Sequence, residues 1–136
     1  MSRIFRYNGA EFSVDFNDAD FFERYWDACE QLGKSEEELK NNKNERGFMR
    51  KYCDMFYAFF DNLFGKGAGD KIYQGRHNVA ECEKIYMRFI GFCGAEVKKF
   101  NEDRVSFAKV NRQGMNRKQR RQATKNVVVI NDASVV

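Results

Sequence analysis

Proline is absent from the 136 residues of this sequence, and histidine occurs once, as His77. A chain without proline must end its helices at glycine or at polar runs. The single histidine is the only candidate for a thiol–imidazole pair, and no cysteine stands at a telling spacing from it. Nucleophilic catalysis is therefore not indicated, and we expect a protein that is not an enzyme.

The cysteines form no C-x-x-C pair, the close spacing that zinc sites commonly use. They are Cys29, Cys53, Cys82 and Cys93. Each falls on a helix face that we expect to be buried, where cysteine behaves as a small apolar residue. We expect reduced thiols, as in a cytoplasm, with no metal and no cofactor.

Long apolar runs are missing as well. The segment 1–7 lacks the apolar stretch of a signal peptide, and no run approaches the ~20 residues that span a bilayer. The glycines of 65–70 (GKGAGD) fit neither G-x-x-x-x-G-K-[ST] nor G-x-G-x-x-G. We expect no membrane contact, and a flexible loop at 65–70 instead of a nucleotide site.

Aromatic residues, by contrast, are abundant: 14 Phe, 6 Tyr and 1 Trp make up 15% of the chain. Around the Asn-Gly dipeptide at 8–9, which is favoured in type I′ turns, apolar and polar residues alternate. Pairing about this turn sets Phe5 opposite Phe12 and Arg6 opposite Glu11. The pattern predicts a two-stranded β-hairpin, which needs a further layer to pack against.

Three helices are expected after the hairpin, over about 18–33, 35–64 and 78–100. Gly33 is the natural end of the first helix. The S-x-x-E sequence at 35–38 has the form of a capping box for the second, although the stretch before residue 48 has no apolar face. That leaves open whether the second helix begins only at 48. The N-x-x-E sequence at 78–81 opens the third.

The second helix has the widest apolar arc, which predicts that it is central to the core. One narrow stripe of this helix is polar, and we place Tyr57 there as a partner-binding residue. The other members of the stripe are Arg50, Asp54 and Asp61. The residues that we expect in the core are Phe12, Phe16, Tyr25, Phe56, Phe59, Phe60, Ile85 and Phe89.

Charge is divided unevenly along the chain. Residues 1–103 carry 16 Lys/Arg and 19 Asp/Glu, a net charge of −3, whereas 104–136 carry 8 Lys/Arg and one Asp, a net charge of +7. The basic residues that we take as candidate contacts are Arg117, Lys118, Arg120 and Arg121. They could bind nucleic acid or an acidic partner, or simply form a solvated extension; no aromatic after Phe107 is present to stack on bases.

Several short segments together resemble small proteins from prophages and tailed phages of Gram-positive bacteria, including proteins similar to tail assembly chaperones. The resemblance covers about residues 3–121. The segments that carry it are Val14-Asp15-Phe16, 59–67 (FFDNLFGKG), 71–75 (KIYQG) with Asn78, and 116–121 (NRKQRR).

The resemblance implies a morphogenesis factor in the cytoplasm of a bacterial host cell, with no catalytic residues. Tail assembly chaperones bind the long, helical tape-measure protein and help tail-tube subunits assemble around it. The tape-measure or tail-tube protein would then be the client, and homo-oligomerisation is left open. The alternative is a small accessory protein that binds nucleic acid through its basic end.

These patterns combine into one predicted organisation. The fold class is α+β and mainly α, with the N-terminal hairpin packed on about three helices. The hairpin and helices form a domain over residues 1–100, and 101–136 form a basic, flexible C-terminal tail.

Overall fold

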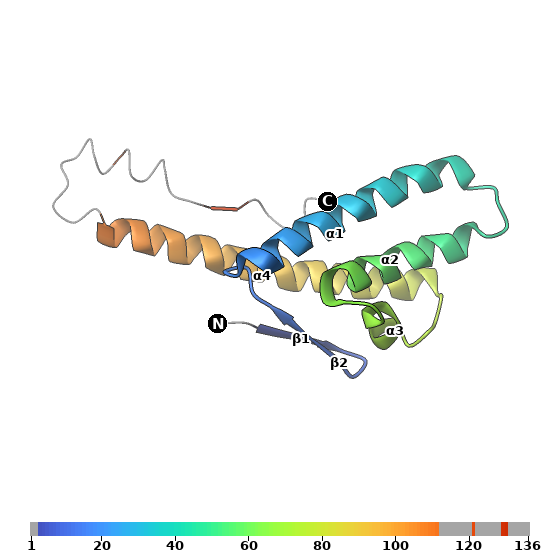
Figure 1. Ribbon diagram of the computed structural model, residues 1–136, viewed down its shortest axis with the longest axis horizontal. Helices are drawn as coiled ribbons and strands as arrows, with labels where there is room; N and C mark the ends of the chain where they lie inside the picture. Colours follow the sequence, from blue (N-terminus) through green and yellow to red (C-terminus); the bar gives the residue numbers. More distant parts are fainter. Residues whose placement is uncertain (1–2, 112–120, 122–128, 131–136) are drawn as a thin grey trace.

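The computed structural model describes residues 3–111, 121 and 129–130. A two-stranded hairpin at the N-terminus lies against an elongated group of helices, as Figure 1 shows. The elements in chain order are β1 (Arg3–Tyr7), β2 (Ala10–Val14), α1 (Ala19–Leu39), the 3-10 turn η1 (Lys40–Asn42), α2 (Phe48–Phe64), α3 (Ala68–Tyr73) and α4 (Val79–Asn111). The predicted α+β class with an N-terminal hairpin is confirmed.

The hairpin has the register that the sequence predicts. Phe5 pairs with Phe12, and Arg6 pairs with Glu11 through an ion pair of 3.1 Å. Asn8 has φ 51° and Gly9 has φ 79°, the positive values that a two-residue type I′ turn needs at both positions.

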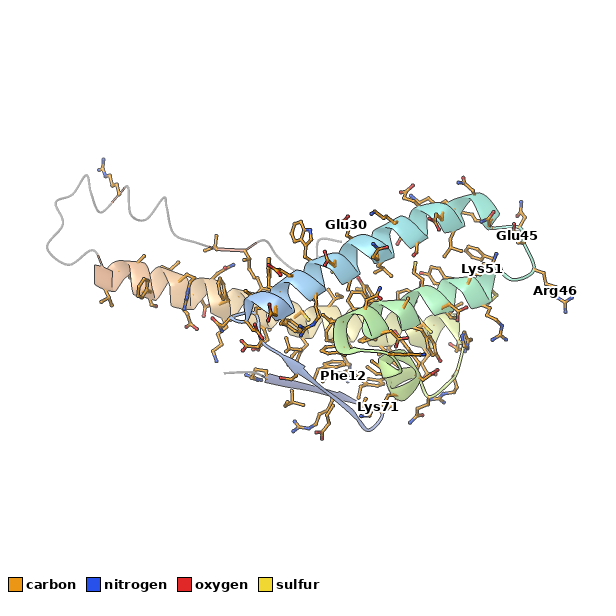
Figure 2. The ribbon with its side chains drawn as sticks, in the orientation of Figure 1. Phe12, Glu30, Glu45, Arg46, Lys51 and Lys71 are labelled. Carbon is orange, nitrogen blue, oxygen red and sulfur yellow. The ribbon has the colours of Figure 1, made fainter. Side chains whose placement is uncertain are left out.

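Side chains on one face of the hairpin attach it to the helices. Phe12 stacks on Phe64 of α2 with ring centroids 4.4 Å apart, and Phe5 meets Phe89 of α4 edge-on at 5.1 Å. Figure 2 shows Phe12 on β2 beside the helical layer. The turn also binds to α3, because the Asn8 side-chain amide donates to the Ile72 carbonyl at 2.9 Å. These contacts with the helices supply the second layer that a two-stranded hairpin needs to be stable.

Helix α1 continues past the two signals that predicted its end. Asp18 caps its start by accepting from the Asp20 backbone N–H at 3.0 Å, as expected. Gly33 lies inside the helix, and Ser35 is no cap, so both predictions are wrong. Leu32 and Leu39, seven positions apart on one face, are both buried. The free energy gained by burying this face exceeds the cost of placing Gly33 inside the helix, which is only about 1 kcal/mol.

The chain reverses between α1 and α2 in the stretch that has no apolar face. Glu45 and Lys51 form an ion pair of 3.3 Å at this end of the helix pair (Figure 2). Of the two starts that the sequence left open for the second helix, the one at residue 48 is confirmed.

Helix α2 lies at the centre of the packing, in contact with α1, α3 and α4. All the residues predicted for the core are buried: Phe12, Phe16, Tyr25, Phe56, Phe59, Phe60, Ile85 and Phe89. Among the cysteines, Cys53, Cys82 and Cys93 are buried and Cys29 is half-buried. The aromatic excess is used mainly in this core, where rings meet edge-on or stacked.

The glycine-rich stretch contains a short helix, α3, where a flexible loop was expected. Gly67 has φ 93° at the start of α3, a conformation that other residues adopt only with strain. Gly69 lies so close to α2 that an added Cβ would be 2.7 Å from the Tyr57 carbonyl oxygen. The glycines therefore allow a backbone-to-helix contact.

Helix α4 begins as predicted and ends later than predicted. Asn78 accepts from the Glu81 backbone N–H at 2.9 Å, which confirms the cap. The helix was expected to end near residue 100 but continues to Asn111, so the first part of the proposed tail is helical. Within residues 3–111, 121 and 129–130, no helix has the length and apolar character to cross a membrane.

Candidate functional site

The C-terminal part of α4 extends beyond the packed core. The buried residues of this helix end at Val97, and no residue of 98–110 is buried. Figure 1 shows this end of α4 projecting away from α2 and α3. A projecting helix that still carries apolar side chains is a candidate surface for a partner.

Large apolar side chains are exposed on this projection. Phe107 is 62% exposed and Val110 is 64% exposed, and their spacing of three residues makes them neighbours on one helix face. Val105 is 38% exposed and falls on a different face by the helical period. The helix end therefore offers apolar contacts on two sides.

An open groove of about 650 Å³ runs along the face that holds Val105. Its lining is Gly94, Val97, Lys98, Asn101, Glu102, Val105, Ser106 and Lys109. Among the lining residues that the structure describes, two valines supply apolar surface, and Lys98 and Lys109 stand beside one carboxylate, that of Glu102.

Asn101, in the middle of this groove, binds the C-terminal segment of the chain. Its side-chain amide donates to the Ile130 carbonyl at 3.0 Å and accepts from the Ile130 backbone N–H at 2.9 Å. Asn101 was not among the predicted site residues, because one asparagine among polar helix residues carries no signal. Of the Val-Val-Val-Ile run at 127–130, only Val129 and Ile130 are described.

The prediction that Tyr57 is an exposed partner-binding residue is wrong. Tyr57 is only 9% exposed, and its ring stacks between Tyr73 at 4.9 Å and His77 at 4.7 Å. Its hydroxyl donates to the Arg76 carbonyl at 2.7 Å. Burial raises the pKa of this phenol to about 12.

The polar stripe of α2 is covered only at Tyr57 and Asp61, whereas Arg50 and Asp54 are exposed. The Asp61 carboxylate accepts from the Gly69 backbone N–H at 2.7 Å, and the Asp54 carboxylate lies 2.7 Å from the His77 ring nitrogen. Three residues of the stripe therefore contact α3 or the loop after it, namely Asp54, Tyr57 and Asp61. Considered within α2 alone, these positions would be assigned to a solvent-facing stripe.

The predicted basic contacts are largely untested by the structure. Arg121 is exposed, which fits a contact role. Arg117, Lys118 and Arg120 lie outside the described residues.

Comparison with known proteins gives one family match. Residues 8–124 match the model of DUF6673, a family of unknown function, and the chain therefore belongs to this family. The match includes β2, every helix and the candidate surface on α4. No curated protein and no solved structure matches the chain.

Proposed function

We propose that this member of the DUF6673 family is a non-enzymatic protein-binding factor that holds an apolar segment of a client on the projecting end of α4. The observation that carries the proposal is the exposure of Phe107 and Val110 on a helix end where none of the described residues 98–110 is buried. Exposed apolar groups in such a place lose water contact only when a partner covers them.

The candidate nucleophiles argue for the non-enzymatic part of the proposal. Burial raises the pKa of the Cys82 thiol to about 12 and that of the Cys29 thiol to about 11. Nucleophilic cysteines need the opposite shift, toward the thiolate. His77 and Asp54 form a close pair, but the His77 ring stacks on Tyr57 and so has a structural role there.

The identity of the client comes from the resemblance to tail assembly chaperones. A tape-measure protein offers long amphipathic helices, and an apolar stripe on such a helix suits the exposed apolar residues of α4. A tail-tube subunit is the second client of this kind. The proposed place of action is the cytoplasm of the bacterial host.

The second candidate function is nucleic-acid binding through the basic C-terminal residues. The net charge of +7 over residues 104–136 and the exposed Arg121 favour it. Binding of this kind depends on neutralising phosphates, so its affinity must fall steeply as salt rises. Apolar contact is much less sensitive to salt, which separates the two functions.

The test is to measure association and dissociation of the full chain on an immobilised tape-measure protein from the same genome. We expect binding that persists as salt increases, and dissociation at least about tenfold faster for the double variant Phe107→Ser/Val110→Ser. That ratio corresponds to about 1.4 kcal/mol, less than the value of burying two apolar side chains.

The matched control is Met49→Ser. Met49 is 64% exposed, like Val110, but lies at the start of α2, at the opposite end of the molecule (Figure 1). Its substitution should leave the kinetics unchanged. Equal effects of both variants, or no binding by the unaltered chain, would refute the proposal, and salt-sensitive retention on DNA or RNA would support the second candidate.

A further inference from the structure

Trp26, the only tryptophan of the chain, lies on the outer side of α1 and is 58% exposed. The inner side of this helix is buried and consists of Phe21, Tyr25, Ala28, Leu32 and Leu39. The ring centroids of Trp26 and Phe22 are 6.3 Å apart, and Phe22, one turn earlier, packs against the core. A tryptophan on a packed support of this kind is a frequent centre of binding energy in protein interfaces.

Trp26 belongs to a row of apolar side chains on α1. Phe22, Trp26 and Cys29 recur at i, i+4 and i+7, which places them on one face of the helix. Phe22 and Cys29 are half-buried, so the row follows the boundary between the core and the solvent. Gly33 continues the row at i+11, and an added Cβ there would meet nothing within 4 Å. The row is therefore open to the side chains of another molecule at Trp26 and at Gly33.

A row of carboxylates runs beside the apolar row. Glu23, Asp27 and Glu30 each come one position after a member of the apolar row, and all three are exposed. Figure 2 shows Glu30 on the side of α1 that faces away from α2. Like charges at spacings of three and four residues destabilise a helix, so the stability of α1 does not explain this row. With seven Asp/Glu and two Lys/Arg, the helix has a net charge of −5.

The two rows define the chemistry of a partner. The carboxylates repel phosphate groups, so nucleic acid and anionic lipid do not fit this face. Lysine and arginine fit it, because their charged ends reach the carboxylates while their aliphatic stems lie over the indole, whose face also attracts cations. A partner helix that lies along α1 has the same rise per residue, so cations at i, i+4 and i+7 match carboxylates that span ~10 Å.

We propose that the α1 face around Trp26 is a docking site for an amphipathic helix of a partner protein, in which Lys or Arg residues stand beside apolar ones. The indole is the central contact, and the carboxylates of Glu23, Asp27 and Glu30 select a basic partner. The proposal goes beyond the proposed function, because it assigns a second surface on another helix and does not depend on the client of α4.

The test titrates the full-length chain with a synthetic amphipathic helical peptide that has arginines at i, i+4 and i+7 beside leucines, and no tryptophan. The fluorescence of Trp26 then reports this face alone, since the chain has no other tryptophan. We expect the emission to shift to shorter wavelength as the peptide covers the indole. An isomeric peptide with its arginines spread around the helix should bind at least about fivefold more weakly.

Substitution of Trp26 tests the central contact. Trp26→Ala should lower the affinity for the peptide at least about tenfold, as measured by the anisotropy of a dye on the peptide. The matched control is Met87→Ala, which removes a side chain that is 66% exposed on a different helix, α4. This control should change the affinity by less than about twofold.

Substitution of the carboxylates tests the selection by charge. Glu23→Gln/Asp27→Gln/Glu30→Gln should lower the affinity at least about tenfold. The control changes the three exposed glutamates of 36–38 to glutamine, which removes as many charges from the same helix but away from Trp26. At 0.15 M salt, where exposed charges are screened over ~8 Å, the control should change the affinity by less than about twofold.

An unchanged Trp26 emission, or equal effects of the two triple variants, would overturn the docking site, because the face would then act only as diffuse negative charge. A salt-sensitive dimer of the unaltered chain that Trp26→Ala dissociates would also overturn it, because the occupant would then be a second copy. Phe107→Ser/Val110→Ser should bind the peptide normally. Failure of the peptide experiment therefore removes the docking site on α1 alone, and failure of the tape-measure experiment removes the proposed function alone.

Discussion

Gly69 lies directly against the backbone of Tyr57. A Cβ at position 69 would be 2.7 Å from the Tyr57 carbonyl oxygen and 2.8 Å from its Cα. The contact holds α3 against α2. A hydrogen bond from the Gly69 N–H to the carboxylate of Asp61, which also belongs to α2, reinforces it. The close approach explains why a glycine, and no larger residue, stands at this position.

Gly69→Ala should therefore destabilise the protein by about 1–3 kcal/mol, since the added methyl meets backbone atoms that cannot rotate away. Urea unfolding followed by circular dichroism would measure the change. Gly33→Ala is the matched control: Gly33 is an exposed residue inside α1 with nothing within 4 Å of an added Cβ. It should stabilise the protein by about 0.5–1 kcal/mol. Similar effects at the two sites would contradict the packing of α3.

Tyr57→Phe should cost about 1 kcal/mol of unfolding free energy, because it removes the part-buried hydrogen bond from the hydroxyl to the Arg76 carbonyl. Tyr57→Ala should cost about 3–5 kcal/mol, as expected for a truncated aromatic in a core. Tyr52→Phe is the comparison, since its hydroxyl bonds Glu83 at 2.7 Å in an exposed position. A change of about 0.5 kcal/mol or less is expected there. A Tyr57→Ala variant as stable as the unaltered chain would contradict the burial of Tyr57.

Stability should fall at alkaline pH. Burial raises the pKa of the Cys82 thiol from 9.0 and that of the Tyr57 phenol from 10.0, each to about 12. The folded chain thus holds these protons more tightly than the unfolded chain, so their contribution is fully present below pH 9 and is lost as the pH rises from 9 through 12. Urea midpoints at pH 7, 9, 10 and 11 would show the decline. Cys82→Ala should lose less stability over this range, and an equal midpoint at pH 7 and 11 would contradict the expectation.

Phe107→Ser/Val110→Ser should leave the unfolding free energy unchanged within about 0.5 kcal/mol, because both side chains are exposed. The same double variant should bind less of a dye that reports exposed apolar surface, such as ANS. Phe89→Ser serves as the opposite control, since Phe89 is fully buried and its loss should unfold or loosen the core. A large loss of stability in the Phe107/Val110 variant would show that this face is packed.

Local patterns account for the elements that the sequence predicted well. The hairpin follows from the Asn8-Gly9 dipeptide and from alternation over the next few residues, and both act within a few positions. The start of α4 follows in the same way from Asn78, whose side chain caps the backbone three residues on. The core aromatics follow from helical periodicity.

The ends of the helices were predicted less well, for a reason that lies in tertiary packing. Gly33 ends a helix when nothing holds the next turn, but Leu39 is buried and keeps α1 intact beyond it. In α4, apolar periodicity fades after residue 100 and nevertheless the helix continues to Asn111, because extending a helix whose earlier turns are already packed requires no new nucleation. Neither outcome can be read from the residues next to the helix end.

The hairpin, its register, the central position of α2 and the residues of the core follow from sequence patterns, since each of these depends on neighbours along the chain. Which polar positions meet water depends on tertiary packing. Tyr57 is covered by Tyr73 of α3 and by His77, whereas Arg50 and Asp54 of the same stripe stay exposed. Asn101 meets Ile130 from 29 positions away. Such contacts join segments that are distant in the sequence, and the residues around one partner do not identify the other.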